Sequence, residues 1–193
     1  MSTATGSAEA KELVFAKVGQ PAPDFNLPST KNMETLKETV SLSDYKGKWL
    51  VLLFYPLDFT FVCPTELTAF SDRLDEFQGI GAEVIGISTD SVHSHRAWVK
   101  TPRDKNGIEG LKYPLASDVA GRLARQYNIL VEEANIALRG LFIINPNGVL
   151  QYAVVHDLNI GRSVDETLRV IQGLQTGGLC AANWTPGQGN LKV

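Results

Sequence analysis

The sequence predicts an α/β domain in which helices flank a mixed central sheet. Residues 49–55 and 82–88 are apolar runs without polar alternation, as in strands that are buried on both faces of a sheet. A helical pattern separates these runs, and a pair of β-prone runs and a last amphipathic helix follow them. The order strand–helix–strand, then hairpin and helix, is expected of a thioredoxin-like fold.

Composition narrows the class of protein before any motif is considered. The chain has 193 residues, of which 44% are hydrophobic, and its net charge is −3. These values fit one domain with a sizeable core and argue against a basic surface for nucleic acid. No apolar run approaches the roughly 20 residues that cross a bilayer, and the first 15 residues lack the core of a signal peptide. We therefore expect a cytoplasmic protein that binds neither membrane nor nucleic acid.

The first half of the domain contains the strand–helix–strand unit. Pro56 ends the strand at 49–55, and a short loop leads to a helix that begins at Cys63. Glycines at 79 and 81 end this helix before the strand at 82–88. One buried helix face is predicted by apolar residues spaced three, four and three apart, namely Leu67, Phe70, Leu74 and Phe77.

The second half completes the domain. Short helices are predicted at 93–100 and 119–127, and residues 137–144 and 148–155 flank an Asn-Pro-Asn turn that predicts a hairpin. Residues 164–174 have the pattern of a last amphipathic helix. We thus divide the chain into a flexible segment at 1–17, a domain at 18–175 and a C-terminal tail at 176–193.

Several familiar site motifs are incomplete in this chain. The glycines at 79 and 81 lack the third glycine of a dinucleotide-binding loop, and they precede a strand instead of following one. The histidines have no metal-ligand spacing with one another or with the cysteines, so surface or supporting roles are favoured for His93, His95 and His156. We expect neither a metal nor an organic cofactor.

Cys63 has the sequence position of a nucleophile. It follows a buried strand at the start of a helix, with Pro64 where a missing N–H costs nothing. The unpaired N–H groups and the partial positive charge of a helix start both stabilise a thiolate. From position alone, the alternative is a buried structural cysteine that acts as a small hydrophobic residue.

Cys180 is the other cysteine of the chain. In a Cys-x-x-Cys redox motif the second thiol lies three residues after the first, but here that position is Glu66. An oxidised Cys63 must therefore find its partner elsewhere, and Cys180 lies in a turn-rich segment that is suited to moving. The alternative is a free thiol in the tail.

Residues 54–66, Phe-Tyr-Pro-Leu-Asp-Phe-Thr-Phe-Val-Cys-Pro-Thr-Glu, resemble the active-site segment of typical two-cysteine peroxiredoxins. These are thiol peroxidases, and they include the peroxidase subunit of bacterial alkyl hydroperoxide reductase. The likeness extends from about Val18 to Pro186 and includes residues 161–168 and the Cys180 segment.

The resemblance implies roles for particular residues. Cys63 would be the peroxidatic cysteine, and Cys180 the resolving cysteine supplied by the partner subunit of a homodimer. Further catalytic residues implied are Pro56, Thr60 and Arg139. Glu66 and Arg162 would support them by organising the arginines near the site, and Trp98 would pack behind it. The family also implies that five dimers assemble into a ring-shaped decamer.

These residue types suit peroxide reduction. A thiolate attacks one peroxide oxygen, while Arg139 and the helix start can stabilise the anion and the charge on the leaving oxygen. Thr60 can accept the peroxide proton or orient the peroxide, and Pro56 can shield the sulfur. The sulfenic acid then condenses with Cys180, and a thioredoxin-like protein or a dedicated flavoprotein reductase regenerates both thiols. The peroxidase itself needs no haem, metal or flavin.

Other functions remain as alternatives. A disulfide reductase of thioredoxin type would need a cysteine at Glu66, and a cysteine hydrolase would need a base beside Cys63. A holdase chaperone or redox relay is permitted by the resemblance as a secondary role. Residues 106–111 do not reproduce the Gly-Gly-Leu-Gly loop of peroxide-sensitive relatives, and residues 190–193 contain no Tyr-Phe pair. We therefore expect resistance to overoxidation.

Overall fold

The structure is a computed structural model that describes residues 14–192. Its central sheet has five strands in the order β5-β4-β3-β8-β9. Strands β3, β4 and β5 are parallel, whereas β8 runs antiparallel to β3, and β9 antiparallel to β8. The predicted mixed sheet is therefore confirmed. The strands comprise Trp49–Phe54 (β3), Ala82–Ser88 (β4), Leu115–Ser117 (β5), Arg139–Ile144 (β8) and Leu150–His156 (β9).

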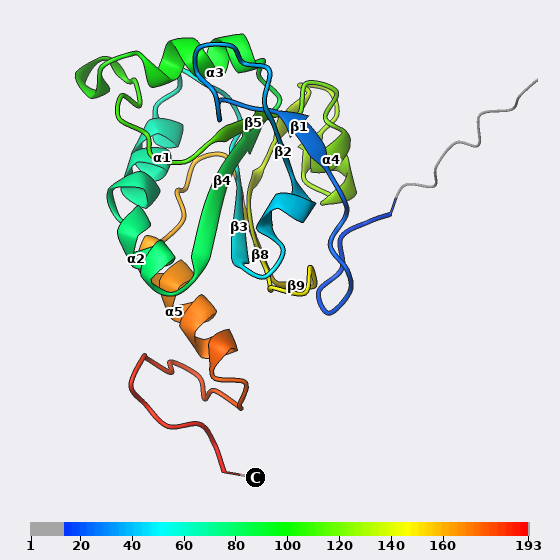
Figure 1. Cartoon of the computed structure of the whole chain (residues 1–193), viewed down its shortest axis with the longest axis vertical. Coiled ribbons are helices and arrows are strands. Elements are labelled where there is room, and N and C mark those ends of the chain that lie inside the picture. The colour runs from blue at the N-terminus through cyan, green and yellow to red at the C-terminus, as the bar shows by residue number, and fades with distance from the viewer. Residues whose placement is uncertain (1–13, 193) are drawn as a thin grey trace, which may run out of the picture.

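Helices and two short hairpins cover this sheet (Figure 1). The helices comprise Val62–Asp72 (α1), Leu74–Gly79 (α2), Val92–Val99 (α3), Arg122–Gln126 (α4) and Val164–Gln175 (α5). One hairpin pairs β1 (Asn26–Pro28) with β2 (Thr39–Ser41), and the other pairs β6 (Leu130–Val131) with β7 (Ile136–Ala137). Single 3-10 turns lie at Leu42–Tyr45 and Arg103–Lys105.

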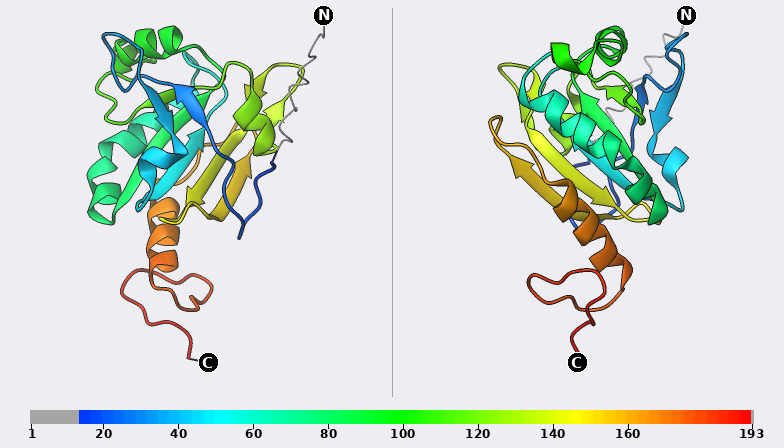
Figure 2. Two further views of the ribbon diagram at one scale, coloured as in Figure 1. Left: turned by 45° about the vertical axis from the view of Figure 1, so that its right-hand side comes forward. Right: turned by 90° about the vertical axis from the view of Figure 1, so that its left-hand side faces the viewer.

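The core has two layers because alternate residues of β3 point to opposite faces of the sheet. Val51 and Leu53 pack on one face with residues of α1, α2 and α5, and Cys63 is part of this layer. Leu50 and Leu52 pack on the other face with residues of α4 and of the β1–β2 hairpin. Figure 2 shows the two coverings on opposite sides of the sheet. Strand β3 is therefore buried on both faces, as its continuous apolar run predicts.

Some element boundaries differ from the sequence prediction. The helix predicted from Cys63 to Phe77 is broken at Arg73, whose φ of −107° and ψ of 17° separate α1 from α2. The apolar spacing continues across the break, because both helices face the same core layer, and so the pattern resembles one helix. Helix α4 is shorter than predicted, since Gly121 has a φ of 62° at its start. Ala137 pairs with β6 instead of joining β8.

The two ends of the described chain differ in their contacts. Residues 1–13 of the segment predicted to be flexible lie outside the described residues, whereas Ala16 donates its backbone N–H to the Gln126 carbonyl at 2.8 Å. The tail folds on itself beyond α5 and projects from the body (Figure 1). There Trp184 is buried, and Arg169 of α5 donates to the Trp184 carbonyl at 2.9 Å.

Candidate active site

The site is built where β3 passes into α1. Tyr55 and Pro56 are buried, a loop turns away from the sheet, and α1 begins one residue before Cys63. The Cys63 side chain is fully buried. Phe61 precedes the helix and makes no side-chain cap to it, so the first N–H groups of α1 keep their partial positive charge toward the sulfur.

Two arginines that are distant in the sequence, one at the start of β8 and one just before α5, surround one glutamate beside Cys63. Arg139, at the start of β8, places its Nη1 3.4 Å from the Cys63 Sγ and 2.6 Å from Glu66 Oε2. Its Nε donates to the Leu158 carbonyl at 2.8 Å, which fixes the guanidinium plane. Arg162 donates to the other oxygen of Glu66, from its Nε at 2.7 Å and from its backbone N–H at 2.8 Å.

The charges of this cluster do not balance without the sulfur. The side chains of Arg139, Glu66 and Arg162 are 4%, 2% and 1% exposed, so water screens them little. Two guanidinium groups face one carboxylate, which leaves one positive charge to be compensated in a buried space. The Arg139 Nη1 points at the Cys63 sulfur, so a negative charge on that atom would compensate the excess.

The loop before α1 carries the other two predicted catalytic residues. Pro56 is buried at the end of β3, and Thr60 is half-buried three residues before Cys63. The Thr60 hydroxyl donates to the Leu57 carbonyl at 3.0 Å, which leaves its oxygen lone pairs for a second partner. Leu57, Phe59 and Phe61 of the same loop are exposed.

Cys180 lies in different surroundings. It is exposed in the tail, and its Sγ is 3.5 Å from the Gly173 carbonyl and 3.6 Å from the Thr176 hydroxyl. Both cysteines are free thiols. Arg162 lies two residues before α5, and the 12 residues of α5 then carry the chain about 18 Å along the helix axis. The structure thus brings Cys63, Glu66, Arg139 and Arg162 together but does not join Cys180 to them.

Three further buried residues, Tyr55, Asp58 and His95, lie beside this site. Tyr55 and Asp58 belong to the segment that resembles peroxiredoxins, but the sequence predicts no role for either. His95 was expected at the surface or in a supporting position, and the structure places it fully buried against Asp58, with 2.9 Å between Nδ1 and Oδ2. Thirty-seven residues separate the two in the chain, so no local spacing signals their contact. Trp98, predicted to pack behind the site, is buried in the same core layer as Cys63.

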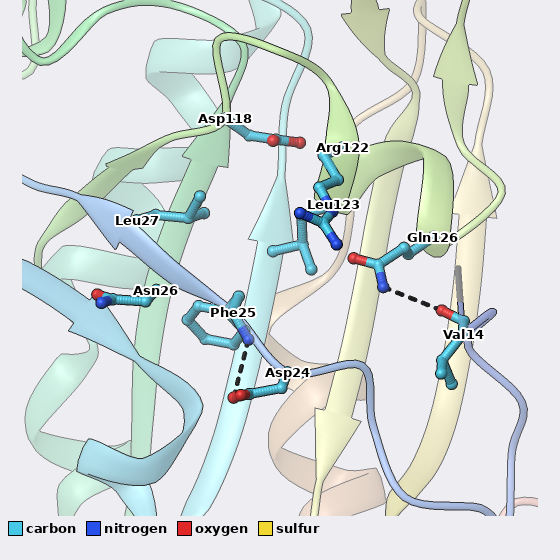
Figure 3. A pocket seen from close by; sticks show the side chains of 9 residues that line it. All are labelled: Val14, Asp24, Phe25, Asn26, Leu27, Asp118, Arg122, Leu123 and Gln126. Atoms are coloured by element: carbon cyan, nitrogen blue, oxygen red, sulfur yellow. Dashed lines mark hydrogen bonds between the residues drawn. The ribbon is translucent and has the colours of Figure 1, made fainter. Parts of the chain in front are cut away.

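One hollow of the surface lies away from these residues. A hollow of about 340 Å³ opens between β1 and α4, and its side chains include Asp24, Asp118 and Arg122 but neither cysteine (Figure 3). Within residues 14–192, no three acidic, histidine or cysteine side chains are grouped as metal ligands would be. No helix of this described part is long and apolar enough to span a membrane.

Comparisons with known proteins place the chain in one family. The model of the AhpC/TSA family matches residues 18–153. The putative peroxiredoxin YkuU of Bacillus subtilis is 57% identical over 175 residues, which cover 90% of this chain and 97% of that protein. The chloroplastic 2-Cys peroxiredoxin BAS1 of Hordeum vulgare is 50% identical over 188 residues, 95% of this chain and 89% of that one. The reduced 2-Cys peroxiredoxin of Plasmodium vivax superposes with a TM-score of 0.86 at 40% identity, covering 91% and 92% of the two chains.

Proposed function

The chain belongs to the AhpC/TSA family and is a thiol-dependent peroxidase, and from this premise we propose that Cys63 is the thiol that reduces the hydroperoxide. The observation that carries the proposal is the 3.4 Å contact between Arg139 Nη1 and the Cys63 Sγ, within a buried cluster that has one positive charge in excess. Cys180 has no comparable contact with a cation in its hydrogen bonds.

The reaction needs only groups that are close to Cys63. The thiolate attacks the terminal peroxide oxygen, the O–O bond breaks, and the alkoxide or hydroxide leaves and takes up a proton. Cys63 is thereby oxidised to a sulfenic acid, and the peroxide is reduced to an alcohol or water. Arg139 can stabilise both the thiolate and the leaving oxygen, while Thr60 orients the peroxide and Pro56 keeps water from the sulfur. Glu66 and Arg162 hold Arg139 in place.

Resolution is proposed to occur between subunits. The sulfenic acid of Cys63 condenses with the Cys180 thiol of a partner, which forms a disulfide and releases water. The direction of α5 supports this assignment, because the helix carries Cys180 away from the Cys63 of its own chain. Cys63 is fully buried, so the start of α1 must unwind before the two sulfurs can meet.

A homodimer would bring a second tail to this site. Strand β9 is an edge of the five-stranded sheet, and its Val155 is exposed. An edge strand offers unpaired N–H and C=O groups to a second copy of the chain. The exposed Leu57, Phe59 and Phe61 give a second apolar surface, through which dimers could assemble into the decamer that the family resemblance implies.

The disulfide must then be reduced from outside. We propose a thioredoxin-like dithiol protein as the reductant, with a dedicated flavoprotein disulfide reductase as the alternative, because the exposed tail leaves Cys180 open to thiol–disulfide exchange. Two free thiols that cycle in this way require a reducing compartment, which supports a cytoplasmic location. Resistance to overoxidation stays a prediction.

Two measurements test the proposal. After a short, substoichiometric pulse of hydrogen peroxide, mass spectrometry of Cys180→Ser protein should locate sulfenic acid at Cys63. Non-reducing electrophoresis of the oxidised unaltered chain should show a dimer that dithiothreitol separates. An unmodified Cys63 would overturn the choice of nucleophile, and an oxidised monomer with an internal Cys63–Cys180 bond would overturn resolution between subunits.

A further inference from the structure

A buried polar cluster lies beside the active-site loop and takes no part in the reaction above. The carboxylate of Asp58 accepts hydrogen bonds from the Tyr55 hydroxyl at 2.9 Å and from the Ser94 hydroxyl at 2.7 Å. It also contacts His95 Nδ1 at 2.9 Å. The side chains of His95 and Asp58 are 0% and 1% exposed. A buried carboxylate beside a buried imidazole is costly unless the two form a compensated pair.

His95 joins the active-site loop to the central sheet. Its Nε2 lies 3.3 Å from the carbonyl oxygen of Ala116 in β5, which can only accept a hydrogen bond. Its Nδ1 faces both oxygens of Asp58, at 2.9 and 3.1 Å. The Tyr55 hydroxyl is closer to Asp58 than to Nδ1, at 2.9 against 3.3 Å, and so it donates its hydrogen bond to Asp58. Each ring nitrogen of His95 thus has a partner, one in the loop and one in the sheet.

Asp58 also fixes the loop that carries Pro56 and Thr60. It lies midway between them, and its backbone N–H donates to Asp90 Oδ2 at 2.9 Å. The next residue, Phe59, has a φ of 56°, which is an unfavourable backbone conformation for a bulky side chain. Such a conformation persists only where its surroundings hold it. The Phe59 ring packs on Trp98 of α3, the same helix that supplies His95, with 6.0 Å between ring centroids.

We propose that the His95–Asp58 pair is a positioning device of the peroxidase site. The pair holds loop 56–61, which carries Pro56 and Thr60, in its strained form, and loss of either partner releases the loop. This inference rests on the proposed role of Cys63. Asp58 and His95 touch neither the sulfur nor the peroxide, so both act through the loop and are positioning residues.

The surroundings of His95 are acidic on the side of the loop. The titratable groups that face the pair are Tyr55 from the end of β3 and Asp90 from the segment after β4, while β5 contributes the Ala116 carbonyl. Burial, together with the charge of Asp58, raises the pKa of Asp90 above its usual range. Burial also raises the pKa of the Tyr55 hydroxyl far enough that it stays protonated beside the carboxylate.

A released loop affects the two chemical steps in opposite directions. Attack on peroxide slows, because Thr60 and Pro56 lose their fixed positions relative to the sulfur. Disulfide formation quickens, because the start of α1 unwinds more readily once the loop before it is loose. A variant that merely lowers the stability of the whole domain has no reason to produce this opposed pair of effects.

The experiment uses the full chain and hydrogen peroxide in single-turnover reactions. His95→Asn and Asp58→Asn should each slow attack on peroxide by about tenfold or more and accelerate disulfide formation. His93→Asn, an exposed change on the same helix, is the matched control and should alter neither step. Because the two residues act as one unit, the double variant should be no slower than the slower single variant.

Hydrogen exchange at one fixed pH separates positioning from general loss of structure. Amides of residues 57–61 should exchange faster in His95→Asn and Asp58→Asn than in the unaltered chain and in His93→Asn. Amides of the central strands should keep their protection in all four proteins.

The possible results decide the inference. If His95→Asn and Asp58→Asn match His93→Asn in both steps, or if both steps slow together, the positioning role is wrong. Should these variants fail to fold, Tyr55→Phe removes one donor to Asp58 but keeps the ring, and it must show the same opposed effects in smaller measure. If Cys63 of the unaltered chain is not oxidised at all, the proposed function fails instead, independently of His95.

Discussion

The surroundings of the two cysteines differ in almost every respect. Cys63 is fully buried at the start of α1, with Arg139 at 3.4 Å and a carboxylate and second arginine behind it. Cys180 is exposed in the tail, and its hydrogen bonds go to neutral oxygens of Gly173, Thr176 and Asn190. The surroundings of Cys63 can stabilise a negative charge, whereas Cys180 is accessible to another thiol.

The difference reflects what each thiol has to do. A nucleophile gains from fixed charges in a dry space, because electrostatic stabilisation is strongest where water does not screen it. A resolving thiol has to meet a sulfur on another subunit and then an external reductant, so it needs access more than activation.

Exchanging each cysteine for serine should separate the two roles most strongly. Cys63→Ser should reduce peroxide consumption to the uncatalysed level, because the nucleophile is gone. Cys180→Ser should oxidise Cys63 at the unaltered rate in a single turnover but should lose turnover with a dithiol protein. Stopped-flow and steady-state assays measure the two quantities, and a slow single turnover in Cys180→Ser would contradict the contrast.

Removing the cation beside Cys63 should have the next largest effect. Arg139→Met should slow attack on peroxide by about 10²- to 10³-fold, the range seen when one preorganised donor is lost from an active site. Arg139→Lys keeps the positive charge but loses the planar guanidinium that the Leu158 carbonyl fixes. Its rate of attack on peroxide should therefore lie between those of the unaltered chain and of Arg139→Met. Arg125→Met, which breaks an exposed pair with Glu132, is the control and should react normally.

Glu66 should matter for stability as well as for rate. Glu66→Gln leaves two buried guanidinium groups without their carboxylate, and breaking such a pair costs about 3–5 kcal/mol in free energy of unfolding. Urea denaturation with an unchanged m-value measures the loss. Glu132→Gln, in its exposed pair with Arg125, should leave the midpoint in place. Equal urea midpoints for Glu66→Gln and Glu132→Gln would show that the buried cluster does not contribute this free energy of unfolding.

The smallest effect is expected in the tail at low pH. The Arg169 guanidinium lowers the pKa of Glu166, and the same arginine donates to the Trp184 carbonyl. A carboxyl group whose pKa is lower in the folded state than in the unfolded state stabilises the fold at pH values above its unfolded pKa. This stabilisation is lost as the pH falls through the folded pKa. Because the pair is partly exposed, the loss should be under about 1 kcal/mol. The protection factors of tail amides, which correct for the intrinsic exchange rate at each pH, should fall below pH 4.5, but less so in Glu166→Gln.

Elements whose signal is local could be predicted from the amino-acid sequence. The strand at 82–88 has the predicted bounds, since an apolar run between glycines and a turn requires no distant partner to be recognised. The position of Cys63 at a helix start is likewise a local property, shown by Pro56, Pro64 and the apolar spacing that follows. The break at Arg73 escaped prediction because the hydrophobic spacing runs through it unchanged.

Which charged groups meet depends on how distant elements pack. Seventy-six residues separate Arg139 from Cys63, and ninety-six separate Arg162 from Glu66, so family resemblance alone indicated these residues. No such indication existed for Asp58 and His95, whose contact depends on α3 packing beside the end of β3. Sequence patterns report how a side chain lies relative to its own helix or strand, whereas the excess charge beside Cys63 and the contact between His95 and Asp58 arise where separate elements meet.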